Sequence, residues 1–186
     1  NISCPNVKEG GLSFGTSVPM TTQITKRLRP LTKKALILKL TPNVTNVGEF
    51  ARAAEGEGAD AVSLINTLVG MAVDVRTRRP KLSTVTGGLS GPAIKPIALL
   101  KVHQVYDVAK RHGVPIIGQG GIANGTDALE FLIAGASAIG LGTGLFYDPH
   151  VCRKINDQIS GYLAQNGFSN VSELTGTLDT TRRSGH

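Results

Sequence analysis

The sequence predicts an α/β fold in which parallel strands alternate with helices, as part of a (β/α)8 TIM barrel. Short aliphatic runs alternate with segments in which apolar residues recur at helical spacing. Polar and glycine residues gather where successive strands end, at Lys39, Asn66, Gly120 and Gly142. A site shared among many strand ends is typical of a barrel. An open dinucleotide-binding sheet is disfavoured, because no predicted strand is followed by G-x-G-x-x-G.

Each predicted strand is apolar along its length, as expected for strands covered on both faces. Asn46 with Glu49 forms a helix-starting pair, and Gly58, Gly113 and Gly135 stand where helices end. The predicted strands are residues 35–40, 60–66, 114–118 and 138–142. The predicted helices are residues 47–57, 97–111, 127–134 and 150–165.

The chain has 186 residues, which is enough for one domain, and 40% of them are hydrophobic. Four strands cannot close an eight-stranded barrel, which typically needs about 250 residues. We therefore expect residues 1–186 to form a single domain that is the C-terminal half or so of a barrel, with residues 180–186 as a flexible tail. The segment 87–95, rich in glycine and proline, leaves the strand–helix pattern at the active face and is expected to contact ligand.

Composition argues against several classes of protein. The net charge is +7, but the basic residues are scattered and only three Tyr, five Phe and no Trp are present, which disfavours nucleic-acid binding. We expect no membrane association, since no apolar run approaches the roughly 18 residues of a membrane span. Cys4 and Cys152 belong to no C-x-x-C pair, so no metal site is expected. Free thiols and the absence of a signal peptide favour a cytoplasmic location.

Two glycine clusters end the last two predicted strands, at residues 118–122 and 140–144. Glycines let backbone N–H groups approach a phosphate, and a short helix starting near Leu145 would direct its positive end there. The alternative is that these glycines only form tight turns. Two clusters on consecutive strands favour phosphate binding, because barrels repeatedly bind phosphate after strands seven and eight.

Several polar side chains at strand ends have two readings. Lys39 either extends to solvent from its strand or neutralises an anion in the barrel mouth. Asn1, Asn6 and Asn66, which precedes Thr67, either form turns or bind a planar heterocycle through amide donors and acceptors.

Cys4 lies between Ser3 and Pro5 in a turn-forming segment. A small buried apolar residue is one reading, but the loop position favours a thiolate able to accept a proton. Cys152 stands at a helix start without polar neighbours and receives no role.

Six strings in this order resemble class 1 dihydroorotate dehydrogenases, and most closely the catalytic subunit of class 1B. They are N-I-S-C-P-N-V at 1–7, K-L-T-P-N-V-T at 39–45, I-N-T-L at 65–68, G-G-L-S-G-P-A-I-K-P at 87–96, G-G-I at 120–122 and G-T at 142–143. The resemblance extends to about Gly161. It implies a flavoprotein oxidoreductase whose barrel binds FMN and oxidises dihydroorotate to orotate in pyrimidine biosynthesis.

The resemblance also implies roles for individual residues. Cys4 would take the proton from C5 of dihydroorotate while a hydride leaves C6 for the flavin. Cysteine at this position is typical of class 1, whereas the membrane-bound class 2 enzymes have serine. The pyrimidine would be held by Asn1, Asn6, Asn66 and Thr67. FMN would be bound by Asn1, Lys39, Ile65, Gly91, Gly120, Gly121, Gly142 and Thr143.

Class 1B enzymes pair this subunit with another that carries FAD and a 2Fe–2S cluster and passes electrons to NAD. The resemblance thus implies a homodimer or heterotetramer, with FAD and the cluster only on the partner. The upstream strands of the family are missing here, so these residues alone should bind FMN poorly. Gly144 and Leu145 also depart from the usual pair after G-T.

Two alternatives remain open at the level of sequence. A dihydropyrimidine dehydrogenase-type FMN barrel shares the S-C-P core and the K-L-T-P-N-V-T string, although Asn6 and the 65–68 segment favour the dihydroorotate enzymes. A non-catalytic truncated barrel would act as a binding or assembly module.

Overall fold

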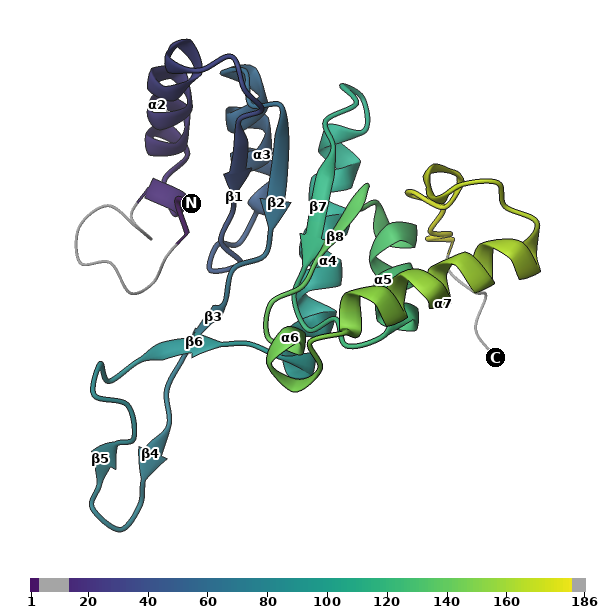
Figure 1. The fold of residues 1–186 in the computed structure, drawn as a ribbon. Helices are drawn as coiled ribbons and strands as arrows, with labels where there is room; N and C mark the ends of the chain where they lie inside the picture. Colours follow the sequence, from purple (N-terminus) through teal and green to yellow (C-terminus); the bar gives the residue numbers. More distant parts are fainter. Residues whose placement is uncertain (4–13, 182–186) are drawn as a thin grey trace.

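The computed structural model describes residues 1–3 and 14–181, which are built around a four-stranded parallel sheet (Figure 1). The sheet order is β1-β2-β7-β8, and every neighbouring pair is parallel. This confirms the predicted α/β class. The strands are β1 (Ile37–Lys39), β2 (Ala61–Leu64), β7 (Ile116–Gln119) and β8 (Ala138–Gly140).

Successive helices pack side by side, α2 on α3, α3 on α4, α4 on α5 and α5 on α7. The fully buried side chains of Leu40, Leu64, Ile116 and Phe131 form part of the core. No helix in residues 1–3 and 14–181 is long and apolar enough to cross a membrane. The α-helices are α2 (Val18–Leu28), α3 (Val47–Gly56), α4 (Lys95–Ala109), α5 (Gly125–Ala134), α6 (Gly144–Tyr147) and α7 (Val151–Asn166). Three 3-10 turns are η1 (Arg29–Leu31), η2 (Pro92–Ile94) and η3 (Val171–Glu173).

The four predicted strands exist but are shorter than expected, and the expectation that all are covered on both faces was wrong. Every residue of β2 is buried. In the edge strands, Ile37 is 43% exposed and Ala138 is also exposed. Within the described residues β1 pairs only with β2, and β8 only with β7. Both edges of the sheet, at β1 and at β8, are therefore unpaired within the described residues.

Helix α2 was not predicted, because threonines occupy its two buried positions, although Val18 and Ile24 also pack against the core. Its buried residues are Thr21 and Thr25. The Thr21 hydroxyl donates to the carbonyl of Phe14 at 2.9 Å, and the Thr25 hydroxyl to that of Thr21 at 2.7 Å. Because these bonds satisfy the hydroxyls, threonine can be buried here. A helix whose buried positions are threonines does not show the apolar periodicity by which helices are recognised in a sequence.

The excursion predicted at residues 87–95 begins earlier than expected. A projecting arm leaves the sheet after β2 and returns before α4 (Figure 1). The arm was missed because its paired segments have only two or three residues each, too short for an alternating pattern. It consists of β3 (Leu68–Gly70) paired antiparallel with β6 (Gly87–Leu89), and of β4 (Val73–Asp74) paired antiparallel with β5 (Arg79–Pro80).

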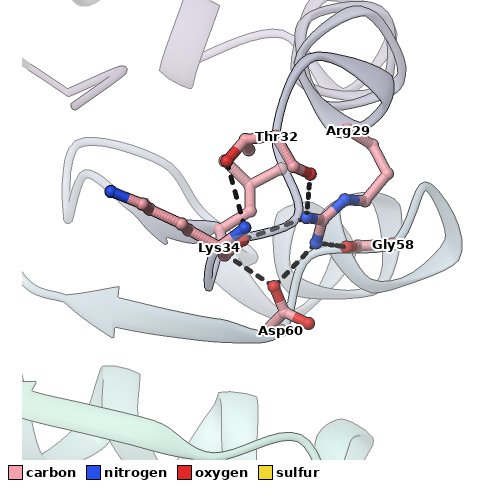
Figure 2. A network of polar contacts seen from close by, with 6 residues as sticks. Arg29, Thr32, Lys34, Gly58 and Asp60 are labelled. Carbon is pink, nitrogen blue, oxygen red and sulfur yellow. Dashed lines mark hydrogen bonds and ion pairs between the residues drawn. The ribbon is translucent and has the colours of Figure 1, made fainter.

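One arginine joins the turn after α2 to the start of the sheet (Figure 2). The Arg29 guanidinium donates to the carbonyls of Gly58, Thr32 and Lys34 and forms a 2.7 Å ion pair with Asp60. The same carboxylate oxygen of Asp60 accepts from the backbone N–H of Leu36 at 2.7 Å. This fork connects the segments that lead into β1 and β2, which supports their parallel pairing.

We expect Arg29→Met to shift the pKa of Asp60 upward. The backbone N–H of Leu36 and then the guanidinium of Arg29 hold the pKa of Asp60 below 3.8. Removing Arg29 should raise that pKa only in part, since Leu36 still donates. Carboxyl NMR titration of the parent and the variant measures the shift. An Asp60 pKa unchanged by the substitution would contradict the described fork.

Candidate functional site

A pocket lies at the carboxyl ends of the four parallel strands, where the segments that follow them meet η2. Nine candidate ligand-binding residues from the sequence line it: Lys39, Ile65, Asn66, Thr67, Gly91, Gly120, Gly121, Gly142 and Thr143. They come from five separate segments of the chain. The structure therefore brings these residues together, while their roles stay predictions.

The turn after β7 requires glycine for two reasons. Gly120 has φ +134° and Gly121 has φ +76°, and residues that carry a side chain rarely adopt such backbone conformations. A β-carbon on Gly120 would lie 2.8 Å from that of Ala98, and one on Gly121 would lie 2.8 Å from the carbonyl oxygen of Gly91. Gly142, in contrast, has open space where a β-carbon would be. The backbone at 120–121 packs against the start of α4 so closely that no side chain fits.

An ionic cluster fixes the other end of this turn. Lys95 pairs with Asp127 at 2.6 Å and with Glu130 at 2.9 Å. The second oxygen of Asp127 accepts from the backbone N–H of Ala123 at 2.9 Å. The side chain of Asn124 caps α5 by accepting from the N–H of Asp127. Sequence reasoning assigned no role to Lys95 or Asp127, which lie 32 residues apart with no local signal linking them.

The charges in this cluster shift each other's titration. Hydrogen bonds to Asp127 and Glu130 raise the pKa of Lys95 above 10.5. Burial alone would raise the pKa of Asp127, but the Lys95 ammonium and the Ala123 N–H offset that effect, so the pKa lies below 3.8. Both groups are therefore charged across the neutral range.

Asn66 ties the start of the chain to the pocket. Its Nδ2 donates to the carbonyl and to the hydroxyl of Ser3, both at 3.0 Å, and its Oδ1 accepts from the N–H of Thr67. Asn1 is not among the pocket-lining residues; its Oδ1 accepts from the N–H and the hydroxyl of Ser3. Ser3 is fully buried. The predicted base Cys4 and the predicted substrate ligand Asn6 lie outside the described residues.

The turn after β8 contacts the returning arm. Thr143 donates its hydroxyl to that of Ser90 at 2.9 Å, and α6 begins at the next residue, Gly144. The predicted short helix near Leu145 is thereby confirmed. Lys39, the last residue of β1, also lines the pocket and is partly exposed. The pocket thus combines a cation, two glycine turns and amide and hydroxyl groups, a set suited to a planar heterocycle with a phosphate.

The family model described as "Dihydroorotate dehydrogenase" matches residues 1–163. The chain belongs to the dihydroorotate dehydrogenase family. It is 55% identical to "Dihydroorotate dehydrogenase B (NAD(+)), catalytic subunit" of Bacteroides thetaiotaomicron, over 96% of this chain and 58% of that protein. The proteins of the same name from Parabacteroides distasonis and Desulforamulus reducens are 53% and 52% identical, over 98% and 95% of this chain.

This dihydroorotate dehydrogenase family chain spans 57% to 59% of the length of those three relatives. The predicted family resemblance is confirmed. The matched region contains every pocket residue, from Lys39 to Tyr147.

The Lys95–Asp127 pair predicts how stability depends on pH. A lowered pKa of Asp127 stabilises the fold above pH 3.8, and this contribution is lost as the pH falls through the folded-state pKa. The contribution of Lys95 is present below pH 10.5 and is lost as the pH rises through its raised pKa. Lys95→Met should therefore flatten the acid side of the stability profile. Urea unfolding at several pH values measures this, and identical acid slopes in parent and variant would contradict it.

Proposed function

We propose that this chain forms the FMN- and substrate-binding part of a class 1B dihydroorotate dehydrogenase. The observation that carries the proposal is that one pocket contains residues expected for both ligands. The names of the relatives, catalytic subunits of dihydroorotate dehydrogenase B (NAD(+)), support it. The reaction is the oxidation of dihydroorotate to orotate in pyrimidine biosynthesis.

The four-stranded sheet is proposed to be the C-terminal half of a (β/α)8 barrel, with residues 1–186 as part of that one domain. The side-by-side packing of successive helices supports this arrangement. The exposed edges β1 and β8 are available for further strands. The share of the relatives' length that the chain covers, 58% in the first case, leaves room for them.

The pocket residues fit FMN. At Gly120 and Gly121 the backbone conformation and the close packing exclude any side chain, which leaves main-chain groups free to face a phosphate. Gly142 and Thr143 add a second turn, and Lys39 adds a cation for the charge near N1 and O2 of a reduced flavin. Ile65 is buried behind them, and Gly91 completes the lining. FMN would supply a two-electron acceptor for the hydride from C6.

The substrate would lie against Asn66 and Thr67, with Asn1 and Asn6 completing its recognition. Cys4 would act as the general base and take the proton from C5. The bonds from Asn66 to Ser3 support this role, since they hold the residue before Cys4 at the pocket. The chain itself would need to lower the thiol pKa for Cys4 to act at neutral pH.

The electron acceptor is proposed to be a partner subunit that carries FAD and a 2Fe–2S cluster and reduces NAD. The proposed assembly is a homodimer or a heterotetramer. The name of these relatives includes NAD(+). The proposed enzyme works in the cytoplasm. These proposals rest on the family resemblance and on the relatives.

The choice of substrate is tested by anaerobic reduction of the flavin. The full-length protein that contains this chain is purified with FMN and mixed with dihydroorotate and, separately, with dihydrouracil. We expect bleaching of the flavin by dihydroorotate only. Bleaching by dihydrouracil alone would support the dihydropyrimidine dehydrogenase alternative and overturn the proposal.

Cys4→Ser should slow flavin reduction by dihydroorotate greatly at neutral pH while FMN binding is retained, because serine is a far weaker base without an activating partner. Stopped-flow absorbance measures the rate, and Cys152→Ser, at an exposed position in α7, is the matched control. A Cys4→Ser protein that reduces its flavin at the parent rate would exclude Cys4 as the base.

A further inference from the structure

Asn43, in the loop after β1, binds the backbone on both sides of Leu68. Its Nδ2 donates to the carbonyl of Thr67 at 3.0 Å, and its Oδ1 accepts from the N–H of Val69 at 3.0 Å. The other Nδ2 hydrogen goes to the Thr41 hydroxyl at 2.9 Å. A side-chain amide presents a donor and an acceptor side by side, as these two bonds require. Asn43 therefore fixes the point where the arm leaves the pocket.

The loop that carries Asn43 is itself held in place. Lys101, on α4, is only 7% exposed, and its ammonium donates to the carbonyls of Val44 and Thr45 at 2.7 and 2.8 Å. Burial lowers the pKa of Lys101. Asn46, the residue after Thr45, caps α3 by accepting from the N–H of Gly48. Asn43 thus projects from a loop fixed at two neighbouring points.

Gly88 also confines Thr67, whose carbonyl accepts from Asn43. In the antiparallel pair β3–β6, Gly88 lies opposite Val69. A β-carbon added at Gly88 would overlap the Thr67 side chain, 2.7 Å from its β-carbon. Gly70, in the same arm, would place a β-carbon at an ordinary 3.8 Å from that of Leu89. Thr67 is therefore held through its carbonyl by Asn43 and through its side chain by the bare backbone of Gly88.

We propose that Asn43 and Gly88 are positioning residues that place Thr67 for binding of the pyrimidine. This rests on the proposed function, in which Thr67 contacts dihydroorotate and orotate. Neither Asn43 nor Gly88 lines the pocket, so both act through Thr67. Asn43 and Gly88 contact Thr67 and Val69, where the arm begins, and not the glycine turns at 120–121 and 142–143. Substituting either residue should therefore weaken pyrimidine binding and leave the proposed FMN site unchanged.

The first test is independent of any ligand. Asn43→Ser is compared with Asn46→Ser, the same substitution three residues away, where serine can still cap α3. Amide hydrogen exchange at Val69 should accelerate about tenfold in Asn43→Ser, since one hydrogen bond is lost, and should match the parent in Asn46→Ser. Equal exchange at Val69 in the parent and in Asn43→Ser would overturn the positioning role.

The second test measures binding of orotate and of FMN by calorimetry in the full-length protein that contains this chain. Gly88→Ala is compared with Gly70→Ala, and Asn43→Asp keeps the size and the acceptor but removes the donor to Thr67. Asn43→Asp and Gly88→Ala should each raise the Kd for orotate about tenfold, as expected when a hydrogen-bonding group is misplaced, with the Kd for FMN and the Gly70→Ala values near the parent.

The two tests separate two failures. Equal loss of FMN and orotate binding in Asn43→Asp and Gly88→Ala would overturn the positioning role in favour of general destabilisation. Absence of orotate binding in the parent itself would overturn the proposed function, while the Val69 exchange rate would still decide whether Asn43 fixes the arm.

Discussion

The parallel register of the sheet is the constraint on which the site depends. Lys39 pairs with Ser63, Leu64 with Gly118, and Gln119 with Gly140. The carboxyl ends of all four strands therefore lie at the same end of the sheet. The segments that follow them must then meet there. Strand β2, buried at all four positions, lies second in this order and is paired on both sides. Its burial stabilises the register, and the register assembles the pocket.

Strand ends alone do not give the loops a shape. Each loop at the pocket is tied by a polar bond to a distant element: Asn66 to Ser3, Asn43 to Thr67, and Lys95 to Asp127. These side chains are buried or only partly exposed. In such surroundings a hydrogen bond to a charged or amide group is stronger than in water. Glycines at 88, 120 and 121 add the complementary constraint, because close packing there leaves no room for a side chain.

The sequence predicted what depends on local pattern. The parallel α/β class, the helix cap Asn46 and the glycine turns all have signals within a few residues. The motif strings at the strand ends located the pocket residues. The cap at Asn124 was found only in the structure, although Asp127 three residues later is the corresponding local signal.

The features that were missed depend on contacts between distant residues. The Asn43–Thr67 bond joins residues 24 apart, Lys101 and Val44 are 57 apart, and Asn66 and Ser3 are 63 apart. No periodicity records such pairs. Helix α2 was missed because threonines occupy its two fully buried positions, and the arm was missed because its strands are very short.

The central claim is that the pocket at the carboxyl ends of the strands binds FMN. A two-dimensional amide NMR titration with FMN tests it most directly, since weak binding is also visible. If FMN binds there, the backbone amides of Gly120, Gly121, Gly142 and Thr143 shift first and together. Saturating FMN that leaves these four amides unmoved, or that shifts only amides of α2 and α3, would contradict it.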